Sequence, residues 1–292
     1  MKTKIAIALS ALLAAFTMSL QADIANYDTT IAGQDSADEL YQFNFDDSLS
    51  ATVGSGTFTA GANTAYTTDL SGNANGALSI TANATSGGYT MANNAFVAGQ
   101  GTVNSVGTLS FLFNISTTSS SEYFLSIGGD TTSDNNALAL DISGGVSQYK
   151  IGNHSTTLPA LTTGVWYYFA VTWNFNGTAS DSSTFYIGQV GGSLNSPTGA
   201  AGGSYTAASE VGGTSAETGS SGNIVVGNRQ ANNTGMLGDY GTLATWSSQL
   251  TSSQIDAQYA ALTTTSAPEP SSVAILASGG AMLLALLRRK KS

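Results

Sequence analysis

The stretch Gly164-Val165-Trp166-Tyr167-Tyr168-Phe169-Ala170-Val171-Thr172-Trp173 is the most apolar run in the interior of the chain. Side chains alternate between the two faces of an extended strand. One face here would carry Val165, Tyr167, Phe169, Val171 and Trp173, and the other Trp166, Tyr168, Ala170 and Thr172. Because both faces hold large aromatic rings, the pattern indicates a central strand that is covered on both sides.

Shorter runs with the same period of two surround this stretch. They cover Tyr41 to Asp46, Gly76 to Ile80, Thr108 to Ile115, Tyr123 to Ile127, Leu138 to Ile142, Phe185 to Ile187 and Ile224 to Val226. Glycine, serine and asparagine separate many of the runs, as turns require. The sequence therefore predicts an all-β fold, an antiparallel two-sheet sandwich. Residues 191–223, rich in Gly, Ser, Thr and Ala, are expected to form a long mobile loop.

One helix start is convincing, near the end of this region. Thr251 can cap the first turn, and Gln254, three residues later, can reach back to it. Ile255 and Tyr259 would share one face of the helix, four residues apart. We expect a single short helix beside the sandwich, and an N-terminal lead-in at residues 23–40.

The N-terminus predicts export. Lys2 and Lys4 precede an apolar run from Ile5 to Leu20, and a cleavage site falls between Ala22 and Asp23. This order is typical of a secretory signal peptide, here residues 1–22. Cysteine is absent, so the exported domain at 41–265 must be stable without disulfide bonds.

Residues 266–292 form a tail in three parts. Pro268-Glu269-Pro270 interrupts regular structure, an uncharged stretch at 271–287 follows, and Arg288-Arg289-Lys290-Lys291 ends it. Seventeen apolar and small residues are near the lower limit for a transmembrane helix, and the basic run should remain cytoplasmic. The tail resembles the PEP-CTERM sorting signal of exported bacterial proteins. That resemblance implies an exosortase-type membrane protease as partner, and a destination in the cell envelope, at the surface or in the extracellular matrix.

Charge excludes one class of partner. Between Asp23 and Ala267 the chain has seventeen acidic residues and two basic ones, Lys150 and Arg229, a formal charge of −15. Nucleic-acid binding needs clustered cations. We therefore exclude nucleic acid, and by the same reasoning an anionic membrane surface, as a partner of the domain.

The order of the strands adds a second resemblance. Tyr41 to Leu49, Gly76 to Ile80, Thr108 to Phe113, Gly164 to Thr172 and Leu250 to Ile255 resemble successive elements of laminin-G-like, concanavalin A-like jelly rolls, and Tyr186-Ile187-Gly188 falls where that family has a turn. The resemblance implies a jelly-roll sandwich. Gly241 stands where the family carries an acidic residue.

Catalytic signatures are missing from the sequence. No Glu-x-Asp-x-x-Glu arrangement supplies the carboxylate pair that a jelly-roll glucanase needs. His154 is the only histidine, flanked by turn residues, and is expected in a surface loop. We expect no enzyme and no cofactor. Calcium stays open as a ligand, because Asp130 and Asp134 lie in an oxygen-rich loop, although a solvated turn explains that loop better.

Sugar binding needs exposed aromatic rings with amide and carboxylate groups nearby. Trp246 and Tyr205 are the best candidates for exposed rings, although ordinary packing is the more probable role of each. The sequence thus favours an exported, non-catalytic envelope or matrix protein that associates with carbohydrate or a surface. A calcium-dependent adhesion module is the alternative, and a divergent glycoside hydrolase a weaker one.

Overall fold

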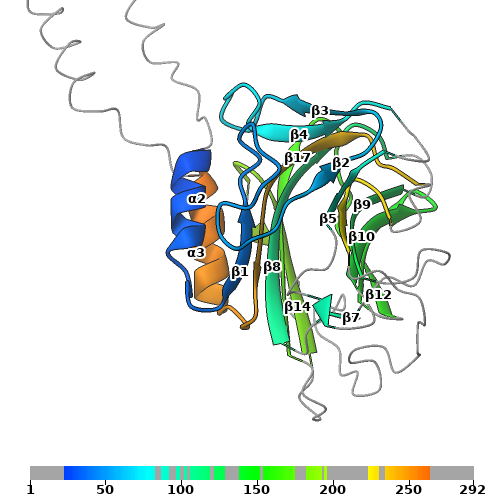
Figure 1. Ribbon diagram of the computed structural model, residues 1–292. Helices are drawn as coiled ribbons and strands as arrows, with labels where there is room; N and C mark the ends of the chain where they lie inside the picture. The colour runs from blue at the N-terminus through cyan, green and yellow to red at the C-terminus, as the bar shows by residue number, and fades with distance from the viewer. Residues whose placement is uncertain are drawn as a thin grey trace, which may run out of the picture.

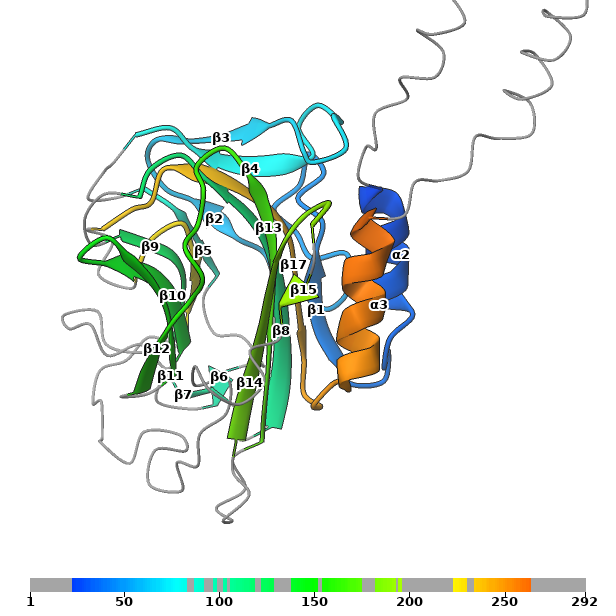
Figure 2. The same ribbon diagram turned by 180° about the vertical axis from the view of Figure 1, so that it is seen from behind.

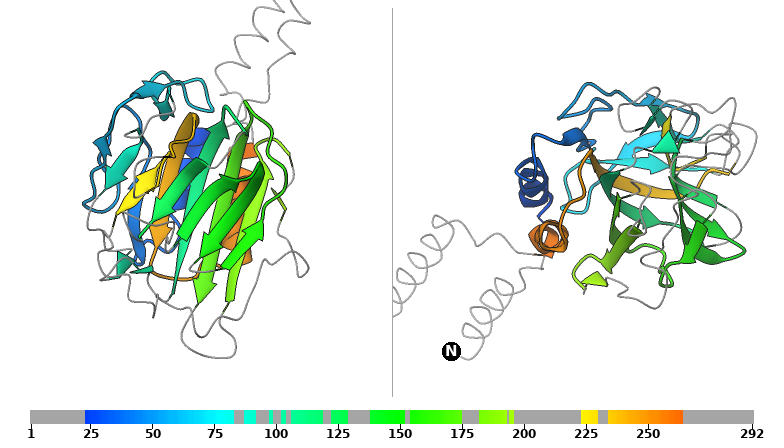
Figure 3. Two further views of the ribbon diagram at one scale, coloured as in Figure 1. Left: turned by 90° about the vertical axis from the view of Figure 1, so that its right-hand side faces the viewer. Right: turned by 90° about the horizontal axis from the view of Figure 1, so that it is seen from below.

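Two antiparallel sheets lie face to face, and two helices pack on the outer face of the larger sheet (Figures 1 and 2). The computed structural model describes residues 23–82, 87–91, 97–98, 102–103, 106–118, 122–128, 138–151, 154–174, 182–192, 194–195, 223–229 and 234–263. Within these residues the predicted all-β, antiparallel two-sheet sandwich is confirmed. Seen end-on, the helices, the larger sheet and the smaller sheet form three successive layers (Figure 3).

The larger sheet has eight strands among the described residues. Their order is β15 (Leu194–Asn195), β14 (Ser182–Gln189), β13 (Trp166–Asn174), β8 (Val106–Ile115), β17 (Gly238–Trp246), β4 (Ala77–Ile80) and β3 (Thr64–Thr67), and β1 (Glu39–Phe43) also pairs with β17. Two strands pair with the same edge of the long strand β17. β4 lies beside the first residues of β17, and β1 lies beside its last residues.

The smaller sheet has seven strands within the same residues. Their order is β12 (His154–Thr157), β11 (Val146–Ile151), β10 (Leu138–Ser143), β9 (Glu122–Ile127), β16 (Ile224–Val226), β5 (Tyr89–Met91) and β2 (Thr59–Ala60). A separate two-stranded ribbon joins β6 (Val97–Ala98) to β7 (Thr102–Val103).

Strand β13 is the central strand that its two apolar faces predict. It pairs with β8 from Trp166 to Asn174 and with β14 from Tyr167 to Asn174. Tyr167, Phe169, Val171 and Trp173 belong to the main core between the sheets, whereas Tyr168 and Ala170 belong to a second core beneath the helices. Both of its faces are therefore covered, as expected.

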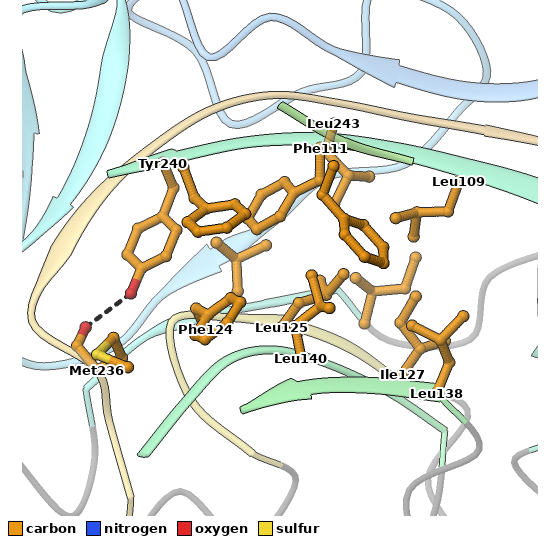
Figure 4. Packing of buried hydrophobic residues seen from close by; sticks show 14 of the residues in the cluster. Leu109, Phe111, Phe124, Leu125, Ile127, Leu138, Leu140, Met236, Tyr240 and Leu243 are labelled. Carbon is orange, nitrogen blue, oxygen red and sulfur yellow. Dashed lines mark hydrogen bonds between the residues drawn. The ribbon is translucent and has the colours of Figure 1, made fainter. Parts of the chain in front are cut away.

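The main core is built from inward side chains of both sheets (Figure 4). Phe113 of β8 stacks on Phe124 of β9 with 4.8 Å between ring centroids, which joins the two sheets directly. Tyr240 is fully buried, and its hydroxyl donates a 2.7 Å hydrogen bond to the carbonyl oxygen of Met236. A buried phenol needs such a partner, because an unpaired polar group would cost about 1–3 kcal/mol.

Two helices are present in the described residues where one is predicted. α2 (Ile24–Ala32) lies in the N-terminal lead-in, where no helix is identified from the sequence. The Asp23 side chain caps it by accepting a 2.9 Å hydrogen bond from the Asn26 amide. Ile24, Tyr27 and Ile31 form its buried face, at the spacing of an amphipathic helix.

The second helix, α3 (Ser252–Thr263), is the predicted one. The Gln254 amide donates to Thr251 Oγ1 at 3.3 Å, and the Thr251 amide donates to Gln254 Oε1 at 2.8 Å. This reciprocal pair is the expected capping box. Ile255 and Tyr259 are both buried against the larger sheet, which confirms their shared face.

Hydrogen bonds fix the helices in one position on the sheet. The Tyr168 hydroxyl donates to Gln258 Oε1 and Gln258 Nε2 donates to Gln34 Oε1, both at 2.8 Å. Trp246 Nε1 donates to the Gln34 carbonyl oxygen at 3.0 Å. Asn26 Nδ2 donates to the Ala261 carbonyl oxygen, so the start of α2 lies beside the end of α3 (Figure 1).

Two local expectations about the strands are wrong. The pairing of β9 with β10 shifts between Leu125 and Tyr123, a β-bulge that turns Phe124 into the core and places Tyr123 opposite Asp141. Tyr123 therefore does not share the inner face of Leu125 and Ile127. In addition, Tyr186 to Gly188 continue strand β14 and form no turn.

Several predicted segments lie outside the described residues. These are the signal peptide at 1–22, the tail at 266–292 with its expected helix at 271–287, and residues 196–222 of the long loop. The described part of that loop includes the short strand β15. In the portion of the chain that the structure describes, no helix is long and apolar enough to span a membrane.

The helix layer should contribute strongly to stability through Tyr27. Tyr27→Ala removes a fully buried ring that meets Tyr168 edge-on at 6.1 Å, and should lower the free energy of unfolding by about 3 kcal/mol. Thr29→Ala on the exposed side of the same helix is the matched control and should change it by less than about 0.5 kcal/mol. Denaturant unfolding of the full chain measures both. Equal effects of the two substitutions would contradict the packing of α2.

Candidate functional site

Four polar or aromatic side chains form a row across the outer face of the larger sheet. Trp166 on β13 lies opposite Asn114 on β8, Asn114 lies opposite Asp239 on β17, and Asp239 lies opposite Ser79 on β4. Directly opposed residues have their Cβ atoms about 4.5–5.5 Å apart on the same face. We call these four residues the acceptor row. The row crosses β13, β8, β17 and β4, which are labelled in Figure 2.

The helices divide this sheet face into two parts. Beneath α2 and α3 the outward side chains are apolar and buried, among them Leu112, Tyr168, Ala244 and Trp246. On β8 and β13 the next outward position belongs to the acceptor row, whereas on β17 the bulge with buried Thr242 lies between Ala244 and Asp239. All four members of the row are partly exposed. The change from buried apolar to partly exposed polar side chains marks the edge of the helix layer.

Trp166 lies beside the bulge in β17. The pairing of β17 with β8 shifts between Tyr240 and Leu243, and Gly241 lies within this bulge. A Cβ atom on Gly241 would lie 3.0 Å from Cβ of Leu112, which is tight, and 3.4 Å from Cζ3 of Trp166, which is an ordinary contact. Glycine therefore avoids crowding Leu112, and the indole ring packs on the edge of the second core and remains partly exposed.

The two central members of the row are an amide and a carboxyl group. Asn114 Oδ1 is buried and has no hydrogen-bond partner among the described residues. Burial raises the pKa of the Asp239 carboxyl, and hydrogen bonding by Ser79 offsets part of that rise. An amide oxygen, a carboxylate and an indole ring on neighbouring strands are the combination that sugar binding uses.

Another carboxyl group lies beyond the row, in the middle of α2. Asp28 accepts a 2.8 Å hydrogen bond from the Thr242 hydroxyl on β17. Burial, followed by the smaller effects of Asp69 and Asp46, raises the pKa of Asp28 to about 7, and the bond from Thr242 opposes the rise. Burial alone raises the pKa of Glu39, on β1, to about 7. Both carboxyl groups are therefore easier to protonate than an exposed acid.

A second cluster lies on the smaller sheet and contains both basic residues of the domain. Lys150 Nζ and the Arg229 guanidinium lie 5.6 and 5.8 Å from the centre of the Tyr123 ring, and Lys150 also pairs with Asp141. Tyr123 is 3% exposed and Asp141 2% exposed. Because the ring is covered, it offers no surface for a ligand, and the cluster serves to neutralise a buried carboxylate.

The structure describes one of the two candidate sugar-binding rings. Trp246 is fully buried, in keeping with the ordinary packing expected of it, because helix α2 covers that part of the sheet and the Gln34 carbonyl oxygen accepts its N–H. Tyr205, Asp130 and Asp134 lie outside the described residues, as do Ala22, Pro268 to Pro270 and Arg288 to Lys291. Asp23 is the N-cap of α2.

The structure also bears on the expectations for His154 and for a metal site. His154 begins the edge strand β12 and pairs with Ile151, so it is not in a loop. Among the described residues, no group of three or more His, Cys, Asp or Glu side chains is arranged to hold a metal ion. The predicted calcium ligands Asp130 and Asp134 lie outside the described residues, so calcium binding there stays a prediction.

Two features of the sequence point to the acceptor row. Strand periodicity alone does not distinguish its residues from those of the core. Trp166 begins β13 on the face opposite to the main core, next to a glycine turn at Gly164. Asn114 is the only amide side chain of β8, and Asp239 is the only charged residue of β17. Only the register, which aligns β13, β8 and β17, brings them together.

No protein-family model and no curated protein matches this chain. Solved structures match at the level of the fold. The chain is similar to Trypanosoma rangeli sialidase in complex with sialic acid, with a TM-score of 0.54 and 14% identity, over 80% of this chain and 37% of the sialidase. The chain thus spans little more than a third of that enzyme's length.

Two other similar structures are single domains. One is domain 4 of AbnA, a GH43 extracellular arabinanase from Geobacillus stearothermophilus, in complex with arabinotriose, with a TM-score of 0.50 and 15% identity over 76% of this chain and 98% of that one. The other is the ligand-binding domain of botulinum neurotoxin serotype D in complex with N-acetylneuraminic acid, with a TM-score of 0.52 and 16% identity over 76% and 50%. At such identities the similarity shows a shared β-sandwich fold.

The raised pKa of Asp28 predicts a dependence of stability on pH. The folded pKa of about 7 lies above the ordinary 3.8, so the stabilising contribution of protonated Asp28 is complete below pH 3.8 and is lost as the pH rises through 7. From this group the free energy of unfolding should fall by up to about 4 kcal/mol between pH 4 and pH 8. Asp28→Asn should flatten that decline in denaturant unfolding measured at a series of pH values.

Asp256→Asn, which removes an exposed carboxylate from α3, is the matched control and should leave the slope as in the unsubstituted chain. A decline that persists unchanged in Asp28→Asn would show that Asp28 is ionised in the folded protein at pH 4. Glu39 shifts in the same direction, so Asp28→Asn should reduce the slope without removing it entirely.

Proposed function

We propose that this chain is an exported, non-catalytic protein of the bacterial envelope or extracellular matrix that associates with polysaccharide through its β-sandwich. The acceptor row carries the proposal, because it places a partly exposed tryptophan, an amide and a carboxylate on adjacent strands of one sheet face. Aromatic rings with nearby hydrogen-bonding groups suit the apolar face and the hydroxyl groups of a sugar.

The fold supports this proposal without identifying a ligand. The sandwich resembles domains whose structures contain arabinotriose and N-acetylneuraminic acid. The order of its strands also fits the concanavalin A-like, laminin-G-like jelly roll that the sequence predicts. Such sandwiches present a wide sheet face, which a chain of sugar units can follow.

A binding role explains the row better than hydrolysis does. A glycosidase of the usual kind needs a second carboxyl group on the opposite side of the bond that it cleaves. Asp239 is the single acid of the acceptor row, and its neighbours across the strands are an asparagine and a serine. The row can hold a sugar but lacks the acid and base pair.

The delivery part of the proposal rests on the two ends of the chain. The signal peptide at 1–22 would direct export, and the PEP-CTERM-like tail would hold the protein at the membrane for an exosortase-type protease. The start of α2 lies beside the end of α3, so residues 23 and 263, where the described domain begins and ends, lie at the same end of the helix layer (Figure 1). One membrane surface could therefore hold both segments before processing.

Sugar binding should depend on Trp166. The full chain, purified in a detergent without a sugar head group, should bind oligosaccharides on a glycan array, and Trp166→Ala should weaken that binding at least about tenfold, since stacking area is lost. Gln148→Ala, a partly exposed amide on the outer face of the smaller sheet, is the control and should bind as the unsubstituted chain does. Unchanged binding by Trp166→Ala would exclude the acceptor row as the site.

The fluorescence of Trp166 offers a direct readout. The chain has three tryptophans, of which Trp173 and Trp246 are fully buried. Acrylamide quenching should therefore report mainly on Trp166, and a bound oligosaccharide should protect it.

Sorting should depend on the tail in two separable ways. Deleting residues 268–292 should release the protein from the membrane fraction of an exosortase-containing host, because the expected helix is lost. Replacing Pro268, Glu269 and Pro270 with alanine should leave the protein in the membrane with its full mass, because the helix remains while the processing signal is gone. Fractionation and mass spectrometry measure both, and a localisation unaltered by the deletion would refute the sorting role.

A further inference from the structure

We infer that the acceptor row recognises sugar units that carry a free amine, as in a polysaccharide with de-N-acetylated hexosamines. This inference rests on the proposed carbohydrate binding and names the ligand class for the same site. It follows from the chemistry of the groups that the row presents and from the position of every basic residue in the domain.

The row presents groups that attract positive charge and hydrogen-bond donors. Asp239 contributes a partly exposed carboxyl group beside Asn114, whose Oδ1 atom is buried without a partner among the described residues. The indole of Trp166, on the other side of Asn114, attracts a cation to its face. An ammonium group supplies donors and a charge, so it can pair with the carboxylate at one end of the row while the sugar lies toward the indole at the other.

No cation of the domain neutralises the row. Lys150 and Arg229 are the only basic residues between Asp23 and Ala267, and both lie at the Tyr123 ring on the smaller sheet. The main core separates that sheet from the one that carries the row (Figure 3). His154, the only histidine, also belongs to the smaller sheet. The charge of Asp239 is therefore left for a ligand.

The surroundings of the row reinforce this selectivity. Asp28 accepts from Thr242, three residues after Asp239 on the same strand, and Asp69 and Asp46 lie close enough to raise its pKa. A sugar with a carboxylate or sulfate group would meet these acids without a compensating cation. Like charges at such a surface disfavour binding, so acidic polysaccharides are poor ligands for this site.

The shape of the row favours an oligosaccharide over a basic peptide. The row crosses four neighbouring strands, about 14 Å at the usual spacing of paired strands, which suits more than one sugar unit. Peptides that add to a sheet use the free backbone groups of an edge strand. The backbones of β13, β8 and β17 are already paired on both sides, so a peptide has no backbone partner here.

Titration of matched oligosaccharides tests the inference. The full chain, in a detergent without a sugar head group, is titrated with a glucosamine hexamer and with its fully N-acetylated counterpart, while tryptophan fluorescence and calorimetry are followed. The amine form should bind at least about tenfold more tightly. Asp239→Asn should abolish that preference but retain binding of the acetylated form, and Trp166→Ala should weaken both. Asp256→Asn removes the same charge from an exposed position on α3 and should keep the preference.

The outcomes separate this inference from the proposed function. If the acetylated hexamer binds as well as the amine form, with Trp166 still required, the amine preference is refuted and carbohydrate binding stands. If pentalysine protects Trp166 as well as the glucosamine hexamer does, the ligand is a basic peptide and the inference is refuted. If no glycan on the array binds, the proposed function itself fails.

Discussion

The structure depends on the need to cover both faces of β13. Its inward rings are buried against the smaller sheet, and its outward residues Tyr168 and Ala170 would be exposed to water if the sandwich had only two layers. An exposed apolar patch of this kind invites association. The helices α2 and α3 cover that patch, and hydrogen bonds from Tyr168 and Trp246 fix them in place. Three layers, rather than two, follow from the composition of one strand.

The helix layer also determines where the candidate site lies. It covers only part of the outer sheet face, and the strands change from apolar to polar outward residues where the layer ends. Trp166 lies at this boundary, supported on one side by the second core and partly open on the other. A rigid sheet holds the row in a fixed geometry, which lowers the entropy cost of binding compared with a loop-borne site. The bulge at Gly241 lies beside the indole, and a Cβ atom there would crowd Leu112 beneath it.

The distribution of charge is the third consequence of the architecture. The domain has two basic residues and seventeen acidic ones, so its surface cannot be neutralised internally. Both basic residues lie at the smaller sheet, around Tyr123 and Asp141. The outer face of the larger sheet is left with Asp239 and Asp28, whose pKa values burial raises. Burial of unpaired carboxyl groups costs stability as they ionise. A proposed role in attracting an amine-bearing sugar gives this arrangement a function.

Much of the fold follows from the sequence, and most of the site does not. Strand periodicity determines the two-sheet sandwich, the central position of β13 and the capping box at Thr251, because each depends on residues close together in the chain. Composition likewise determines the acidity of the domain. Local pattern fails at Tyr123, where a bulge reverses the facing of the side chain. At Trp246 the pattern leaves burial and exposure both open, and a helix more than two hundred residues earlier in the chain covers the ring. The acceptor row joins residues of four strands from distant parts of the chain, so only the register of the folded sheet decides that they meet. The sequence by itself thus determined the layers and the charge, whereas tertiary structure decided which side chains face solvent together, because that depends on long-range pairing.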